Sequence, residues 1–336
     1  MNTTANMLEK VKPMNTIQAV NLALEEAMTL DSEVILLGED IADAQEGGIV
    51  GVTKGLSTKF GTARVRSTPI SEQAIIGAAI GASIVGMRPV AEIMLMNFTT
   101  VAMDMIVNHA AKLRYMSGGQ THVPITIRTM TGAGFGTGGQ HADYLEAWFA
   151  HVPGMKVVAP SSPADAYGLM LSCIFDDDPC LFIENLPTYW NPGPPPQAGQ
   201  RIPLGKAHVL REGSDVTLIS YSRTVHDCAA VADKLAKEGI QVEVIDLRTI
   251  SPLDEGTLLK SVAKTGRAVV VHEAVRKFGV GAEIAALLNE HLFGQLKAPV
   301  QRIGSNQSPV PFSKTLEMAF VPQQSGIEAA IRKTLV

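Results

Sequence analysis

Hydrophobic residues follow two alternating patterns along the chain. Short apolar runs such as EVILLG (33–38) and VTLIS (216–220) are typical of buried strands. Between such runs, apolar residues recur at helical spacing, for example over 16–28, which Thr16 is expected to cap, and over 163–174. Strands that alternate with helices indicate parallel sheets covered on both faces. The pattern therefore predicts an α/β fold.

The same criteria predict further elements. We expect strands at 89–95, 124–129, 156–160, 180–184, 242–246 and 268–273, and helices at 72–86, 101–116, 225–239 and 281–293.

A proline-rich segment divides the alternation into two halves. Residues 186–200, LPTYWNPGPPPQAGQ, contain five prolines and two glycines, which do not fit inside a regular element. We expect a flexible arm at 1–13, a first domain at 14–186, a linker at 187–200 and a second domain at 201–336. The prediction is two parallel-sheet α/β domains.

Composition and charge exclude several classes of protein. With 336 residues, 46% of them hydrophobic, the chain is long enough for two cores. The net charge of −5 and the lack of long basic tracts argue against binding to nucleic acid or an anionic membrane. No apolar run reaches about 18 residues and the N-terminus lacks an apolar signal core, so we expect a cytoplasmic protein. The three cysteines lack C-x-x-C spacing, which favours a reducing compartment.

The glycine-rich segment TGAGFGTGGQH (131–141) is a candidate binding loop. It contains G-x-G, but the βαβ spacing and the downstream acid of a dinucleotide-binding fingerprint are missing. A plain flexible loop is one interpretation. A loop that ends in Gln-His-Ala-Asp is more often functional than a polar turn, which makes His141 a candidate.

Glu72 is a second candidate. It begins the expected helix 72–86, where the helix dipole favours a carboxylate. A structural role at the helix start is therefore one interpretation. The other is a buried carboxylate that hydrogen-bonds to a ligand and exchanges a proton near neutrality.

Several colinear stretches become distinctive when taken together. They include TPISEQAIIGAAIGAS (68–83), GMRPVAEIMLMNF (86–98), GQHADYLEAWFAHVPGMKVVAPSSPADA (139–166) and VEVIDLRTISPLD (242–254). They resemble the β subunits of the E1 components of 2-oxo acid dehydrogenase complexes, of the pyruvate, acetoin or branched-chain type. The resemblance covers nearly the whole chain. It implies a transketolase-like fold, with a pyrimidine-binding domain for thiamine diphosphate followed by a transketolase C-terminal domain.

The resemblance also implies roles for individual residues. Glu72 matches the glutamate that hydrogen-bonds to N1′ of the cofactor's aminopyrimidine and so promotes loss of the C2 proton. Ile70, Met94 and Phe98 match positions that contact the pyrimidine, with Phe98 offering a flat face. From the residues alone, Met94 is interpreted as a core residue. His141 matches the active-site histidine, which handles the substrate carboxylate and assists acyl transfer to lipoamide.

One departure from the family concerns the residues after His141. Many members read His-Ser-Gln, whereas this chain reads His-Ala-Asp at 141–143. The carboxylate of Asp143 favours a charged imidazole if it lies close to it. The departure leaves the substrate open: acetoin, pyruvate or a branched-chain oxo acid.

The acidic turn DDDP (176–179) has two interpretations. Three carboxylates after a helix oppose its dipole, and a solvated turn is the simpler explanation. The resemblance implies instead a structural potassium ion held by Ile125, Cys173, Asp176 and Asp178. At Asp178, relatives commonly carry asparagine.

A missing signature predicts a partner. The chain has no Gly-Asp-Gly, the motif with which thiamine-diphosphate enzymes bind Mg²⁺ and the diphosphate. The resemblance implies that an E1 α subunit supplies it, in a heterotetramer of two α and two β subunits. The expected activity is that of an oxidoreductase that cleaves the C–C bond next to a carbonyl and passes the acyl group to a lipoyl-bearing E2 acyltransferase.

Two other functions remain open. One is a subunit of a split transketolase, or of another thiamine-diphosphate lyase or synthase that uses no lipoyl acceptor. The other is a non-catalytic scaffold, against which the intact Glu72, Phe98 and His141 argue.

Overall fold

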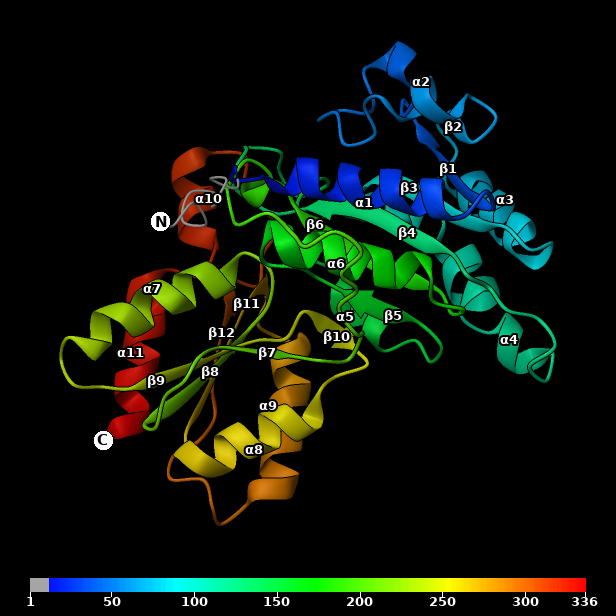
Figure 1. The fold of residues 1–336 in the computed structure, drawn as a ribbon. Coiled ribbons are helices and arrows are strands. Elements are labelled where there is room, and N and C mark those ends of the chain that lie inside the picture. Colours follow the sequence, from blue (N-terminus) through cyan, green and yellow to red (C-terminus); the bar gives the residue numbers. More distant parts are fainter. Residues whose placement is uncertain (1–11) are drawn as a thin grey trace, which may run out of the picture.

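Two sheets flanked by helices make up the computed structural model, which describes residues 12–336 (Figure 1). The first has strand order β10-β5-β6-β4-β3-β1-β2 and the second β12-β11-β8-β9-β7. Most neighbours are parallel, whereas β10 and β7 run antiparallel to β5 and β9. The predicted α/β class with two mostly parallel sheets is confirmed. The strands are β1 (Val34–Glu39), β2 (Val65–Thr68), β3 (Arg88–Leu95), β4 (Thr126–Thr131), β5 (Lys156–Val158), β6 (Cys180–Asn185), β7 (His208–Arg211), β8 (Val216–Ser220), β9 (Val242–Asp246), β10 (Thr249–Ser251), β11 (Ala268–Val275) and β12 (Gln301–Ser305).

Helices cover both faces of each sheet because the strands are apolar on both sides. In β1, Val34 and Leu36 enter one core and Ile35 and Leu37 the other, as expected for side chains that alternate across a strand. The α-helices are α1 (Thr16–Leu30), α2 (Leu56–Phe60), α3 (Glu72–Ile84), α4 (Leu113–Met116), α5 (Glu146–Ala150), α6 (Pro163–Ile174), α7 (Thr224–Ala236), α8 (Glu255–Thr265), α9 (Val280–Leu292), α10 (Lys314–Phe320) and α11 (Gln324–Leu335). Short 3₁₀ segments are η1 (Asp43–Gln45), η2 (Met96–Thr100) and η4 (Leu186–Thr188), and η3 (Met105–Ala110) is a π-helix.

Two local predictions need correction. Asn15, not Thr16, caps α1: its side chain accepts a hydrogen bond from the Gln18 amide in a capping box. The helix expected at 101–116 is interrupted, since η3 has π geometry with an Ala111 N to Ile106 O bond of 3.0 Å. The wider turn buries both Ile106 and Ala111 in the core, which a regular α-helix would place on different faces.

The two halves are joined by more than the proline-rich segment. One core runs from α3 and the first sheet into α8 and α9 of the second half. β10, from the second half, extends the first sheet beside β5. The proposed domain boundaries therefore stay a prediction, and the expected arm at 1–13 lies, apart from residues 12 and 13, outside the described residues. Within 12–336, no helix has the length and apolar character needed to cross a membrane.

Candidate active site at the carboxyl edge of the first sheet

The candidate residues follow neighbouring strands of the first sheet. Glu39 ends β1, Glu72 opens the helix after β2, Phe98 follows β3, and His141 follows β4 after the glycine-rich loop. These strands are neighbours and parallel, so their carboxyl ends meet at one edge. Ligands of parallel α/β sheets bind at that edge.

Glu72 lies at this edge with a second carboxylate close by. It is the first residue of α3 and is only 9% exposed. Burial raises the pKa of Glu39, and the charges of Glu72, Asp40 and Glu92 raise it further. Glu39 was not among the residues predicted from the sequence, although its position at the end of an apolar strand run was a usable signal.

Phe98 and His141 are in direct contact. Their ring centroids lie 5.4 Å apart and the planes meet at 75°, an edge-to-face arrangement. Both side chains are partly exposed, and the His141 amide donates to Gly138 O at 3.2 Å. The structure therefore brings together two of the predicted residues.

Asp143 binds Asn97 instead of the histidine. Its carboxylate accepts from Asn97 Nδ2 at 2.9 Å, and its amide donates to Asn97 Oδ1 at 3.1 Å. Burial raises the pKa of Asp143, while the Asn97 bond lowers it. No hydrogen bond or ion pair between Asp143 and His141 occurs in the described chain. Asp143 thus ties the segment after the loop to η2, a role that the sequence did not reveal.

Met94 and Ile70 lie in contrasting surroundings. Met94, near the end of β3, is partly buried against the core beneath α1 and α6. Ile70, in the turn before α3, is 81% exposed.

A buried charged cluster holds the strands behind Met94. Arg128 donates to both oxygens of Glu184, at 2.7 and 2.9 Å, and also binds Glu92. Tyr189 donates to the same Glu184 at 2.7 Å. Burial and the charge of Glu184 raise the pKa of Glu92, against the effect of Arg128. The cluster links β3, β4 and β6, and it was missed because the charges alternate with apolar residues in strands that otherwise look like plain core.

The oxygens predicted to bind potassium already have protein partners. Asp176 accepts from Lys156 at 2.6 and 2.7 Å, and Asp178 accepts from Arg114 at 2.6 Å. The other two predicted ligands use their carbonyls in backbone bonds, Ile125 with Cys180 at 2.9 Å and Cys173 with Asp176 at 3.2 Å. Over residues 12–336, no cluster of three or more His, Cys, Asp or Glu residues is arranged to hold a metal. A carbonyl oxygen has two lone pairs and can accept a hydrogen bond while it binds a cation, so these bonds do not decide the matter and the potassium site stays a prediction.

Comparison with known proteins identifies the family. Residues 12–189 match the transketolase pyrimidine binding domain, and 205–327 match the transketolase C-terminal domain. The chain is 46% identical to the acetoin:2,6-dichlorophenolindophenol oxidoreductase subunit beta of Cupriavidus necator, over 94% of this chain and 96% of that protein. It is 43% identical to the pyruvate dehydrogenase E1 component subunit beta of Rickettsia felis, over 94% and 96% of the two chains. The chain belongs to the family of E1 β subunits.

This E1 β subunit also has a similar fold among solved structures. A protein described as a split gene transketolase, inactive beta4 tetramer, aligns with a TM-score of 0.76 over 96% of this chain and 98% of that chain. At 23% identity the likeness concerns the fold alone. The family resemblance and the transketolase-like fold expected from the sequence are thus confirmed for this E1 β subunit, whereas the roles of its site residues remain proposals.

Proposed function

We propose that this chain supplies half of a thiamine-diphosphate active site in a 2-oxo acid or acetoin dehydrogenase, and that an α subunit supplies the other half. The observation that carries the proposal is the contact of Phe98 with His141 at the strand edge where Glu72 begins α3. An acid, an aromatic face and a histidine at one edge are the groups that a pyrimidine site with adjoining acyl chemistry requires.

The residues at the edge fit the aminopyrimidine of thiamine diphosphate. When bound, the cofactor supplies the nucleophile and electron sink for cleaving a C–C bond next to a carbonyl. The Glu72 carboxyl group would hold a proton at N1′. Phe98, Met94 and Ile70 would provide apolar walls.

His141 is proposed to act on the substrate side. A histidine changes charge near neutral pH, so it can bind a substrate carboxylate and exchange a proton during acyl transfer to a lipoyl arm of an E2 acyltransferase. Its contact with Phe98 would place it beside the bound pyrimidine.

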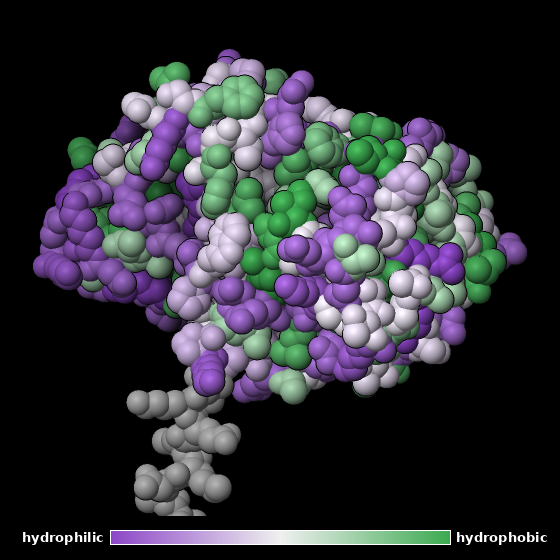
Figure 2. All heavy atoms as spheres, turned by 90° about the horizontal axis from the view of Figure 1, so that it is seen from above, coloured by the Kyte–Doolittle hydropathy of each residue, from purple (hydrophilic) through white to green (hydrophobic). Residues whose placement is uncertain are grey.

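The partner is proposed to be an E1 α subunit that binds Mg²⁺ and the diphosphate, in a heterotetramer of two α and two β subunits. The chain lacks the Gly-Asp-Gly signature. Several large apolar side chains are also exposed, among them Ile70, Tyr115 and Phe278. Figure 2 shows green hydrophobic patches between the purple polar residues on the face seen from above. Such patches are typical of protein contact surfaces.

The substrate is proposed to be acetoin or a small 2-oxo acid, since the similar proteins are named for acetoin and pyruvate. The test is co-expression with the α subunit, followed by acceptor-dye reduction across a panel of oxo acids and acetoin. Reduction with at least one of them supports the proposal. Ketol transfer between sugar phosphates without dye reduction would contradict it and favour a split transketolase.

A further inference from the structure

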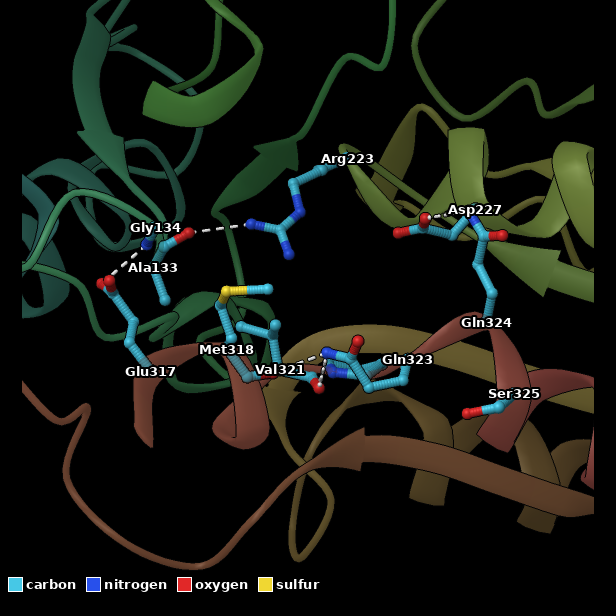
Figure 3. A pocket seen from close by; sticks show the side chains of 11 residues that line it. Ala133, Gly134, Arg223, Asp227, Glu317, Met318, Val321, Gln323, Gln324 and Ser325 are labelled. Carbon is cyan, nitrogen blue, oxygen red and sulfur yellow. Dashed lines mark hydrogen bonds between the residues drawn. The ribbon is translucent and has the colours of Figure 1, made fainter. Parts of the chain in front are cut away.

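Two glutamates of the second half bind the backbone of the glycine-rich loop. Glu273, in β11, accepts from the Ala133 amide at 2.7 Å. Glu317, in α10, accepts from Gly134 at 2.6 Å (Figure 3). It also accepts from Gly136 at 3.0 and 3.2 Å. Both side chains are buried, at 5% and 2% exposure. Three backbone amides of one loop thus donate hydrogen bonds to two carboxylates that lie more than a hundred residues away in the sequence.

The carbonyl side of the loop is also held. Arg223 donates to Ala133 O at 2.8 Å, so both polar backbone groups of Ala133 have partners in the second half (Figure 3). Asn185, at the end of β6, donates to the second oxygen of Glu273 at 3.0 Å. The carboxylate therefore joins the loop to the first sheet as well. A cavity of about 470 Å³ opens beside Ala133, Arg223 and Glu317, so solvent reaches one side of this arrangement.

Close contacts with side chains of the second half also restrain the loop residues just before His141. Gly138 has φ +76°, and a Cβ there would lie 2.4 Å from the Phe312 ring. A Cβ on Gly139 would lie 2.9 Å from Pro309. A side chain at either position would force Phe312 or Pro309 to move, and the positive φ of Gly138 itself favours glycine. The amide of His141 donates to Gly138 O. The second half thus contacts the loop at Ala133, Gly134, Gly136, Gly138 and Gly139.

The two carboxylates determine the conformation of the loop for three physical reasons. A loop with five glycines in the eight residues 132–139 has many conformations to lose when it is ordered. Hydrogen bonds to a carboxylate are stronger than those to a neutral acceptor. Ala133 is buried, so its amide left without an acceptor would destabilise this conformation in favour of others, whereas at the exposed Gly134 and Gly136 the lost bonds to Glu317 would free the loop.

We propose that Glu273 and Glu317 are positioning residues, which hold the 132–139 loop from the second half so that His141 faces Phe98. The inference rests on the proposed function of His141 for its catalytic consequence. The restraint of the loop by the two glutamates does not depend on that function.

The experiment compares Glu273→Gln, Glu317→Gln and a control in the assembled complex with the α subunit and thiamine diphosphate. The control is Glu243→Gln, because Glu243 is also buried in the second half and accepts a backbone amide, Gly213 at 3.2 Å, but contacts no loop residue. Amide hydrogen exchange over residues 132–141 is the first readout. The second is the single-turnover rate of acyl transfer to a lipoyl domain, measured beside cofactor affinity.

Each variant is expected to speed exchange only at the amides that its glutamate binds. Glu317→Gln should speed exchange at Gly134 and Gly136 by roughly tenfold or more, and Glu273→Gln should do so at Ala133, because a bond to a charged group is weakened or lost. Acyl transfer should fall in both while cofactor affinity stays, and the control should match the parent. If one variant fails to assemble, the other still tests the proposal at its own amide.

If the glutamate variants exchange these amides at the parent rate, the inference is wrong. It is also wrong if the variants exchange faster but still transfer acyl groups at the parent rate, while His141→Ala is impaired in acyl transfer. If exchange accelerates at the expected amides but His141→Ala transfers acyl groups at the parent rate, the hold on the loop stands and the proposed function of the histidine fails.

Discussion

The imidazole of His141 meets the ring of Phe98 edge-to-face, with centroids 5.4 Å apart. The two residues follow different strands, β3 and β4, so the contact depends on correct sheet pairing. Edge-to-face pairs contribute about 0.5–1.5 kcal/mol beyond their buried area. The contact with Phe98 therefore restrains the imidazole of His141.

Replacing His141 by alanine should slow acyl transfer to the lipoyl domain by about 10²–10⁴-fold, the usual contribution of a general acid or base. Cofactor affinity should change little, because Glu72 and Phe98 remain. His208→Ala is the control, since His208 is exposed on the edge strand β7. Single-turnover kinetics measure both. A parent rate for His141→Ala would show that the histidine is a bystander.

For Glu72→Gln, cofactor binding should persist while exchange of the cofactor's C2 proton slows by about 10²-fold or more. The amide can still hydrogen-bond to N1′, but it cannot share a proton with it. The matched control is Glu255→Gln, because Glu255 is likewise the first residue of a helix, α8, but is exposed. NMR of the C2 proton in the reconstituted complex is the measurement. Equal C2 proton exchange rates in the two variants would mean that Glu72 serves only as a carboxylate at the start of a helix.

Stability should fall with rising pH because of Glu146, whose carboxyl group is buried and accepts from Tyr221 at 2.5 Å. Burial raises the pKa of Glu146 to about 7. A group with a raised pKa in the folded state contributes stability below its unfolded pKa, and this stability is lost as pH rises through 7. The loss should reach about 3 kcal/mol by linkage. Glu146→Gln should remove this part of the pH dependence in denaturant unfolding between pH 5 and 8, and identical slopes in parent and variant would argue against it.

Local patterns predicted the elements with long apolar runs, whereas β2, β7, β12, α8 and α11 were not predicted. The helix 163–174 and the strands 216–220 and 242–246 have the expected bounds, because continuous apolar runs and a Ser-Pro start carry a strong signal. The edge strand β10 was missed, since its three residues join a sheet built from the other half of the chain.

The candidate site was predictable only in part. The family resemblance pointed to Glu72, Phe98 and His141, and the structure places Phe98 against His141. It gave no sign of Glu273 and Glu317, which lie 140 and 183 residues from the amides they bind. Periodicity describes which face of an element is buried and is blind to polar contacts across such separations. For the same reason the binding of Asp143 to Asn97 could not be foreseen.

The central claim is that this chain holds half of a thiamine-diphosphate site. The most direct test is acceptor-dye reduction by the rigorously purified chain, alone and mixed with its α subunit, with thiamine diphosphate and Mg²⁺ present in both. We predict no turnover by the chain alone and substrate-dependent turnover in the mixture, because the groups that bind Mg²⁺ and the diphosphate come from the partner. Turnover by the chain alone would contradict the claim.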